Sequence, residues 1–316
     1  MTLPDDHDAR MARAHLALEG LSLGDGFGER FFGKPEWVVP MIEQRALPAG
    51  PWAWTDDTAM AIGITEVLQR HGGIDADDLA GVFARRYGQD PGRGYGRGTH
   101  AILGEVRAGA QWRGVSGAVF GGTGSLGNGA AMRIAPLGAY FADDLDALVE
   151  HAQRSAEPTH AHPDGAAGGV AVAVASALVH RERPSGPVEA EQLLPAVIER
   201  TPEGPTRDGL ELAQGLGLGC ELATAAEKLG TGRMVVSADT VPFCVWSAAR
   251  NLGHYERAMW QTVAGLGDRD TTCAIVGGIL AGNVGAAGLP AEWLETREAL
   301  PSPIDAPFPD RARGAP

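Results

Sequence analysis

The 316-residue sequence predicts one all-α domain, and three observations support this fold class. Most apolar residues recur at the three- and four-residue spacing of amphipathic helices. Alternating apolar and polar runs bounded by hairpin turns are scarce. No internal repeat and no long linker divides the chain, so a single domain is expected.

Helical periodicity is strongest in seven segments. They span residues 8–23, 55–71, 75–87, 164–179, 241–250, 254–264 and 271–283. We expect the first helix to break at Gly24-Asp25-Gly26 and the second to end at Gly72-Gly73. The fourth is so rich in Ala and Val that it should be a buried helix, although residues 170–174 are also compatible with a strand.

The segments between these helices are expected to be loops. Two glycine-rich stretches, 91–98 and 121–129, are too short to be linkers and are typical of shaped loops. Residues 201–207 are rich in proline, glycine and charge, which indicates a surface loop. We expect a flexible N-terminus at 1–8, a domain at 9–300, and an extended or frayed tail at 301–316, where five prolines occur without periodicity.

Composition and charge exclude several classes of function. The formal net charge of −14, without a Lys/Arg cluster, argues against general nucleic-acid binding. No apolar run is as long as about 18 residues, so no membrane span is expected. The charged first residues do not form a secretory signal. The three cysteines lie far apart and indicate neither disulfides nor a zinc site, so we expect reduced thiols and a cytoplasmic protein.

The most informative feature is a pair of acidic segments, Trp54-Thr55-Asp56-Asp57-Thr58 and Gly267-Asp268-Arg269-Asp270-Thr271-Thr272. Each places two carboxylates and at least one hydroxyl at the start of a predicted helix. If the fold brings them together, the carboxylates repel one another unless cations bind between them. Oxygen ligands of this kind suit Mg²⁺, Mn²⁺ or Ca²⁺ rather than zinc.

Helix capping is the alternative interpretation of these segments. Thr and Asp are common at helix N-termini, where their oxygens accept backbone N–H groups and the helix dipole favours negative charge. Thr55 is the expected N-cap, with Asp56 and Asp57 in the first turn. A cap needs only one side-chain oxygen, however, so the neighbouring acids are left without an explanation.

Glycine-rich segments supply further candidates. In the stretch 24–30, Asp25 is best read as a turn or capping residue, and Glu29 lies among aromatic residues that either raise its pKa or simply flank a surface acid. The stretch 121–133 is compatible with an anion-binding loop or with a tight structural loop. It lacks the Gly-Lys-Ser/Thr of a P-loop, so nucleoside triphosphate binding is not expected.

Two other segments complete the candidates. Thr159-His160-Ala161-His162 offers two histidines, which could ligate a transition metal but are more typical of a structural or substrate-facing role. Gly277-Gly278 and Ala281-Gly282 follow the second acidic segment. Small residues there predict a central helix that packs closely and holds Asp268 and Asp270 rigidly.

Taken together, these segments resemble the ADP-ribosylglycohydrolase family. The motifs occur in the family's order between about residues 20 and 282. They are Gly24-Asp25-x-x-Gly28, Trp54-Thr55-Asp56-Asp57-Thr58, Gly124-Ser125-x-Gly127-Asn128-Gly129-x-Ala131-Met132-Arg133, Thr159-His160, Val241-Pro242-Phe243 and Gly267-Asp268-x-Asp270-Thr271. No single motif is decisive, but the ordered set is specific.

The resemblance implies an orthogonal bundle of helices that binds two divalent cations, Mg²⁺ or Mn²⁺. The implied cation ligands are Thr55, Asp56, Asp57, Asp268, Asp270 and Thr271. The implied ADP-ribose site consists of Gly124, Ser125, Leu126, Gly127, Asn128, Gly129, Met132 and His160, with N–H groups of the loop facing the diphosphate. Asp57 and Glu29 are our candidates for proton transfer.

Three positions depart from the family's pattern. Phe32 stands where many members have a glutamate, so Glu29 either takes over that role or has no counterpart. Arg269 replaces a common threonine and either contacts a phosphate or points away. Leu126 occupies a position that is aromatic in some relatives. These departures bear on the leaving group and on catalysis more than on the fold.

The sequence therefore predicts a monomeric, metal-dependent hydrolase that cleaves the C1″ glycosidic bond of an ADP-ribosylated acceptor and releases ADP-ribose. Two alternatives remain open. One is a family member that binds ADP-ribose without hydrolysing it, because of the acid missing at Phe32. The other is a metal-dependent phosphohydrolase that acts on a nucleotide diphosphate.

Overall fold

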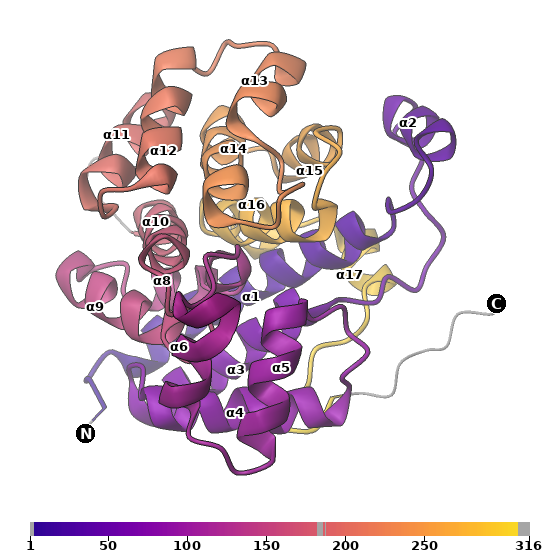
Figure 1. The fold of residues 1–316 in the computed structure, drawn as a ribbon. Coiled ribbons are helices and arrows are strands. Elements are labelled where there is room, and N and C mark those ends of the chain that lie inside the picture. Colours follow the sequence, from indigo (N-terminus) through magenta and orange to yellow (C-terminus); the bar gives the residue numbers. More distant parts are fainter. Residues whose placement is uncertain (1–2, 182–185, 187, 309–316) are drawn as a thin grey trace.

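A computed structural model describes residues 3–181, 186 and 188–308, and within these residues the secondary structure is helical throughout (Figure 1). The described helices are α1 (His7–Glu29), α2 (Pro35–Glu43), α3 (Asp56–His71), α4 (Ala76–Gln89), α5 (Arg97–Arg107), α6 (Trp112–Gly122), α7 (Gly129–Met132), α8 (Ala135–Tyr140), α9 (Leu145–Ala156), α10 (Pro163–His180), α11 (Ala190–Arg200), α12 (Pro205–Leu216), α13 (Leu222–Leu229), α14 (Ser237–Arg250), α15 (Tyr255–Val263), α16 (Arg269–Val284), the short 3₁₀ helix η1 (Ala286–Gly288) and α17 (Ala291–Thr296). Isolated β-bridges join Trp52 to Arg297 and Gly127 to Val236. The predicted all-α class is confirmed.

Helices α1 and α16 pack against each other along much of their length in the middle of the fold (Figure 1). The expected break of the first helix at Gly24-Asp25-Gly26 is wrong, because α1 continues to Glu29. These glycines serve close packing instead of a turn. A methyl group on Gly24 would lie 2.1 Å from the carbonyl oxygen of Cys273 in α16.

The small residues of α16 serve the same close packing from the other side. A methyl group on Gly277 would lie 2.4 Å from the carbonyl oxygen of Gly20, and one on Gly282 would lie 2.4 Å from the ring of His180. Any larger side chain at these positions would push the helices apart. This confirms the prediction of a closely packed central helix behind the second acidic segment.

Helix α10 is the buried helix that the sequence predicts. Its residues are almost all inaccessible to solvent, and it packs against α8, α9, α14 and α16 (Figure 1). Residues 170–174 lie in this helix, so the strand alternative is wrong there. Helix α3 runs from its N-cap Thr55 to His71 and ends at Gly72 in the left-handed conformation, as its sequence predicts.

The starts of three helices differ from the expected boundaries. Helix α12 starts at Pro205, inside the segment expected to be a surface loop, since proline is well suited to a first helical position. Helix α14 begins at Ser237, and Pro242 lies in its first turns. Helix α5 begins at Arg97, just inside the glycine-rich stretch 91–98.

The described parts of both chain ends contact the body of the fold. His7 starts α1 and is buried, with Nδ1 2.9 Å from the Tyr140 hydroxyl. Near the other end, Arg86 donates to the carbonyl oxygen of Ile304, and the Phe308 ring packs against Trp54. The rest of the proline-rich tail, 309–316, lies outside the described residues, as do residues 1–2. No helix in the described ranges is long and apolar enough to span a membrane.

Candidate active site

Residues of both acidic segments line one cavity of about 450 Å³. It lies where the N-termini of α3 and α16 meet the glycine-rich loop that precedes α7. All eight residues expected to bind substrate line this cavity, and so do five of the six expected cation ligands. The exceptions among the predicted residues are Thr55 and Glu29, which lie outside the lining.

Asp25 organises the first acidic segment from within α1. Its carboxylate is fully buried and accepts hydrogen bonds from the backbone N–H groups of Thr55 (2.9 Å) and Thr58 (3.1 Å). It also accepts from the hydroxyl groups of Thr55 (2.9 Å) and Thr58 (2.5 Å). Asp25 is thus a capping residue, as expected, but it caps the start of another helix. Its carboxylate ties α1 to α3 at the cavity.

Thr55 is the N-cap of α3, and its Oγ1 accepts the N–H of Asp57 at 3.4 Å. The same hydroxyl donates towards the carboxylates of Asp25 and Asp57, at 2.9 and 3.1 Å. The backbone N–H of Asp56 is held by the carbonyl oxygen of Arg93 at 2.7 Å. Capping therefore fixes the backbone, while the carboxylates of Asp56 and Asp57 remain directed into the cavity.

The second acidic segment is held from the glycine-rich loop. Asp268 is the N-cap residue of α16, but its side chain makes no capping bond to that helix. Instead, the side-chain amide of Asn128 donates to Asp268 Oδ2 at 2.8 Å and to Thr240 Oγ1 at 3.1 Å. Asp270 Oδ1 accepts its neighbour's N–H, from Thr271, at 2.8 Å. Capping alone does not account for Asp268.

The carboxyl groups in the cavity repel one another, and burial disfavours their charged forms. Burial, followed by the charges of Asp25 and Asp268, raises the pKa of Asp56 to about 8. Burial and then the charge of Asp270 raise the pKa of Asp57 well above its ordinary value. Burial and then Asp268 do the same to the pKa of Asp270. Carboxyl groups that raise one another's pKa values in this way need protons or cations among them.

The donor set fits hard divalent cations. Its oxygens are carboxylates and hydroxyls, and Asp57 Oδ1 is buried with no hydrogen-bond partner in the described structure. Asp56, Asp57, Asp268, Asp270 and Thr271 face the cavity and would hold the cations. Over the described ranges, no three His, Cys, Asp or Glu side chains stand in metal-binding geometry as they are. Cation binding therefore remains a prediction.

The glycine-rich loop is braced by the segment that precedes α14. The N–H of Asn128 donates to the carbonyl oxygen of Val235 (3.2 Å), and the N–H of Ser237 donates to that of Leu126 (3.1 Å). The N–H groups of Gly124 and Gly127 are also bonded within the protein, to Val119 O and Ser125 Oγ. The N–H groups of Gly124, Gly127 and Asn128 thus have internal partners, and the expectation that N–H groups of this loop face a diphosphate stays a prediction.

The opposite rim of the cavity is apolar and was not predicted. Phe120, Met234 and Val235 line the cavity with exposed fractions of 62, 72 and 54%. Phe120 and Val235 have φ values of 55 and 56°, a left-handed conformation that costs a β-branched or bulky residue energy. Nothing in the sequence marks these residues, because their backbone conformation comes from the loop contacts.

A third wall comes from residues 93–99. The guanidinium of Arg93 is buried, pairs with Glu298 at 2.7 Å and lies 3.3 Å above the Trp54 ring. This pair ties the loop to the C-terminal segment and so supports the N–H contact to Asp56. Arg97 follows at the start of α5 and is exposed at the cavity wall.

The two histidines of the His-x-His motif have separate roles. His160 is buried and lines the cavity beside the glycine-rich loop. His162 is the N-cap of α10, where its Nδ1 accepts the N–H of Asp164 at 3.1 Å. His162 therefore has a structural role, whereas a substrate-facing role for His160 stays a prediction, consistent with its place in the cavity wall.

The structure also shows where the residues that depart from the family's pattern lie. Arg269 points away from the cavity: its Nη1 donates to the carbonyl oxygen of Phe31 at 2.7 Å, beyond the end of α1. Phe32 is 47% exposed and lies 5.3 Å from that guanidinium. Glu29 is exposed at the end of α1 and is near enough to raise the pKa of Asp270, after burial and other carboxylates.

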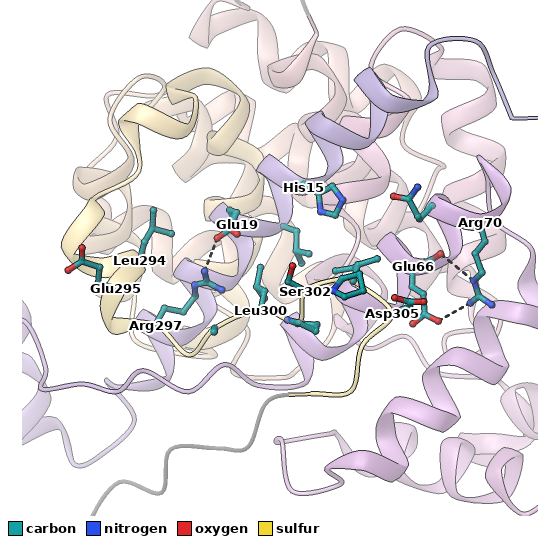
Figure 2. A pocket seen from close by; sticks show the side chains of 16 residues that line it. His15, Glu19, Glu66, Arg70, Leu294, Glu295, Arg297, Leu300, Ser302 and Asp305 are labelled. Atoms are coloured by element: carbon teal, nitrogen blue, oxygen red, sulfur yellow. Dashed lines mark hydrogen bonds and ion pairs between the residues drawn. The ribbon is translucent and has the colours of Figure 1, made fainter.

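A larger cavity of about 800 Å³ lies elsewhere, between α1, α3 and the C-terminal segment (Figure 2). Its charges are largely paired within the protein: Glu19 with Arg297 at 2.8 Å and Glu66 with Arg70 at 3.1 Å. None of the predicted site residues lines it. The size of a cavity therefore does not identify the functional site. The smaller cavity is the better candidate, because its carboxylates have no ion-pair partner in the described structure.

Comparison with known proteins gives consistent findings. A model of the ADP-ribosylglycohydrolase family matches residues 6–311. ADP-ribosylhydrolase ARH3 of Gallus gallus is 28% identical over 92% of this chain and 90% of its own. ADP-ribosylarginine hydrolase Tri1 of Pseudomonas putida (strain GB-1) is 26% identical over 90% of this chain and 73% of its own. A solved structure, "ADP-ribosylglycohydrolase-related protein complex", has the same fold, with a TM-score of 0.59, 24% identity and coverage of 92 and 93%.

Proposed function

The chain belongs to the ADP-ribosylglycohydrolase family, and from this premise we propose that it hydrolyses the C1″ glycosidic bond of an ADP-ribosylated acceptor with the help of two divalent cations, Mg²⁺ or Mn²⁺. The observation that carries the proposal is the composition of one cavity. Carboxylates at the starts of α3 and α16 form one end, and the glycine-rich loop with His160 forms a wall.

The shape of the cavity suits a ligand with a polar and an apolar end. At about 450 Å³ it falls in the ordinary range for small-molecule pockets. The ribose of the scissile bond would lie at the acidic end, near Asp56 and Asp57. The base would lie at the apolar rim, where Phe120 supplies an aromatic ring at a site whose loop has Leu126 in place of one.

The chain's own groups have distinct roles in this reaction. The oxygen of water forms a bond to C1″, the bond from C1″ to the acceptor breaks, and the departing group takes up a proton. Asp57 would accept the proton from the water, because it lines the acidic end of the cavity. Asp25 and Asn128 position the acids without reaching the reacting atoms.

Asp56, Asp57, Asp268, Asp270 and Thr271 would hold the cations, with Thr55 as a supporting hydroxyl. When bound, the cations would supply Lewis acidity and lower the pKa of water towards neutrality. They would also neutralise the repulsion that now raises the pKa values of the carboxyl groups. Glu29 remains a candidate for proton transfer to or from the acceptor, from its place outside the lining.

A panel of ADP-ribosylated substrates tests the proposal and separates its alternatives. Arginine-linked and serine-linked peptides and an ADP-ribosylated nucleic-acid end would each be incubated with Mg²⁺, and the products separated by chromatography. Intact ADP-ribose supports the proposal. Tight binding of ADP-ribose with no turnover of any substrate would identify a non-hydrolytic binder, which the missing acid at Phe32 favours. AMP or phosphate as product would identify a phosphohydrolase.

We also propose that the enzyme is cytoplasmic and monomeric.

A further inference from the structure

The ring of His160 lies against the glycine-rich loop at the wall of the cavity. It follows the end of α9 and is only 4% exposed. A methyl group on Gly129 would lie 2.8 Å from His160 Nε2, so the loop leaves room only for a glycine there. Within the described part of the chain, Nε2 makes no hydrogen bond, whereas Nδ1 has one partner. His160 thus presents one free ring nitrogen at the cavity.

The other ring nitrogen belongs to a short hydrogen-bonded chain. Arg133 Nη1 donates to Thr159 Oγ1 at 2.9 Å, and Thr159 Oγ1 lies 2.8 Å from His160 Nδ1. All three side chains are buried, with exposed fractions of 0, 1 and 4%. Arg133 is itself held by the carbonyl oxygen of Ser155 at 2.7 Å and lies over the Phe83 ring.

The chemistry of these groups sets the direction of each bond. An arginine side chain has donors only, so Thr159 Oγ1 must accept from Arg133. A threonine hydroxyl has a single hydrogen, and its remaining partner is His160 Nδ1. The hydroxyl therefore donates to Nδ1, which must be unprotonated. In a neutral imidazole the proton then resides on Nε2.

The opposite arrangement is less favourable. If Nδ1–H donated to Thr159, the hydroxyl would accept twice and its own hydrogen would have no acceptor among the described residues. A buried donor without a partner is costly. A doubly protonated ring is also disfavoured, because burial and the nearby charge of Arg133 lower the pKa of His160 to about 3.

We propose that Arg133, acting through the Thr159 hydroxyl, fixes His160 as a neutral imidazole whose Nε2–H donates to an acceptor oxygen of the bound nucleotide. The inference rests on the proposed function for the identity of that nucleotide, ADP-ribose. It assigns His160 to ligand binding through a fixed donor and excludes it as the general base. Arg133 and Thr159 are positioning residues, since neither lines the cavity.

This assignment sharpens what the cavity recognises. The loop N–H groups of Gly127 and Asn128 are used internally, so a side-chain donor adds to what the wall offers the oxygen-rich part of the ligand. His160 supplies that donor beside the same loop. Because Nε2–H cannot accept, a ligand must place a ribose or phosphate oxygen opposite it.

Nitrogen-15 NMR of the free protein tests the proposal, since long-range coupling patterns distinguish the two neutral tautomers. The chain has nine histidines, so the signal would be assigned by its loss in His160→Gln. We expect the Nε2–H tautomer in the wild-type protein and in Thr159→Ser, which keeps a hydroxyl. Thr159→Val removes the hydroxyl at nearly equal volume, and we expect it to give a mixture of both tautomers.

Two NMR outcomes would overturn the inference: an Nδ1–H tautomer in the wild-type protein, or an unchanged signal in Thr159→Val. Thermal unfolding of the two Thr159 variants would confirm that each is folded. Neither NMR outcome bears on hydrolysis, so failure here leaves the proposed function standing.

Calorimetric titration with ADP-ribose gives a second readout. His160→Leu should weaken binding by about tenfold, the loss expected for one hydrogen bond, whereas His160→Gln keeps an N–H donor and should bind more tightly than the leucine variant. Equal affinity of the two variants would contradict a donor role for His160. No binding by the wild-type protein would instead count against the proposed function, while the tautomer result would stand.

Discussion

The acidic end and the apolar rim of the cavity are built in opposite ways. Asp56 and Asp57 are 7 and 1% exposed, and their helix start is tied to α1 by the hydrogen bonds that the Asp25 carboxylate accepts from four donor groups of Thr55 and Thr58. Phe120, at the kinked end of α6, is 62% exposed, and Met234, in a loop, is 72% exposed. Buried, cross-linked groups hold position, whereas exposed apolar groups adapt. In the function proposed above, this contrast assigns the chemistry to the acidic end and recognition of the base to the rim.

The largest effect is expected from removing one charge at the acidic end. Asp57→Asn should lower kcat by at least about 100-fold, because even residues that only orient metal ligands cost about 10–100-fold. Steady-state kinetics with Mg²⁺ would measure this, and far-UV circular dichroism should show unchanged helix content. The matched control is Asp208→Asn, which removes an exposed carboxylate from the first turn of α12. Near-normal turnover by the Asp57 variant would contradict the role of Asp57 as the proton acceptor.

Cations should stabilise the acidic end and leave the rim unchanged. Mg²⁺ at a hundred times its Kd would raise the free energy of unfolding by about 2.7 kcal/mol. Hydrogen exchange should then slow at the amides of residues 55–58 and 268–272, with little change at 233–236. Equal protection of both regions, or of neither, would erase the proposed distinction between them.

Rigidity of the acidic end should depend on the close contact of α1 with α16. Gly24→Ala places a methyl group 2.1 Å from the carbonyl oxygen of Cys273, next to Asp25. We expect unfolding in urea to show a loss of about 1–3 kcal/mol, the usual cost of overpacking, together with reduced activity. In Gly81→Ala, where nothing lies within 4 Å, the same change in a helix should stabilise the protein by roughly 0.5–1 kcal/mol. A Gly24 variant as stable as the Gly81 variant would show that the helices can separate freely.

The smallest effect is expected at the rim. Phe120→Asn removes the ring but tolerates the left-handed backbone, so stability should be preserved or slightly increased. Affinity for ADP-ribose should fall about fivefold, the low end of aromatic stacking on a base. Phe120→Tyr, which keeps the ring, is the control. Unchanged affinity in Phe120→Asn would place the base elsewhere in the cavity.

The sequence predicts those features whose cause is local. Thr55 was recognised as an N-cap and α10 as a buried helix because capping chemistry and apolar periodicity depend only on nearby residues. The glycines at 24–28 were misread as a turn. A glycine that allows a turn and one that allows close helix packing look the same until the partner helix is known.

The parts of the site that could not be predicted depend on long-range contacts. Asn128 reaches Asp268 across 140 residues of sequence, and Arg93 reaches Glu298 across 205. The conformation of Phe120 likewise depends on the kink at the end of α6. Motif order brought the acidic segments and His160 into one hypothesis, but only the fold shows that they share a cavity.

Withdrawal and return of cations tests the central claim most directly. The wild-type protein would be treated with EDTA, assayed on an ADP-ribosylated peptide that it turns over, and assayed again after Mg²⁺ or Mn²⁺ is restored. The account predicts that release of intact ADP-ribose stops with EDTA and returns with either cation. Release that continues unchanged in EDTA would contradict it, because the four carboxyl groups at one end of the cavity would then have no role in the reaction.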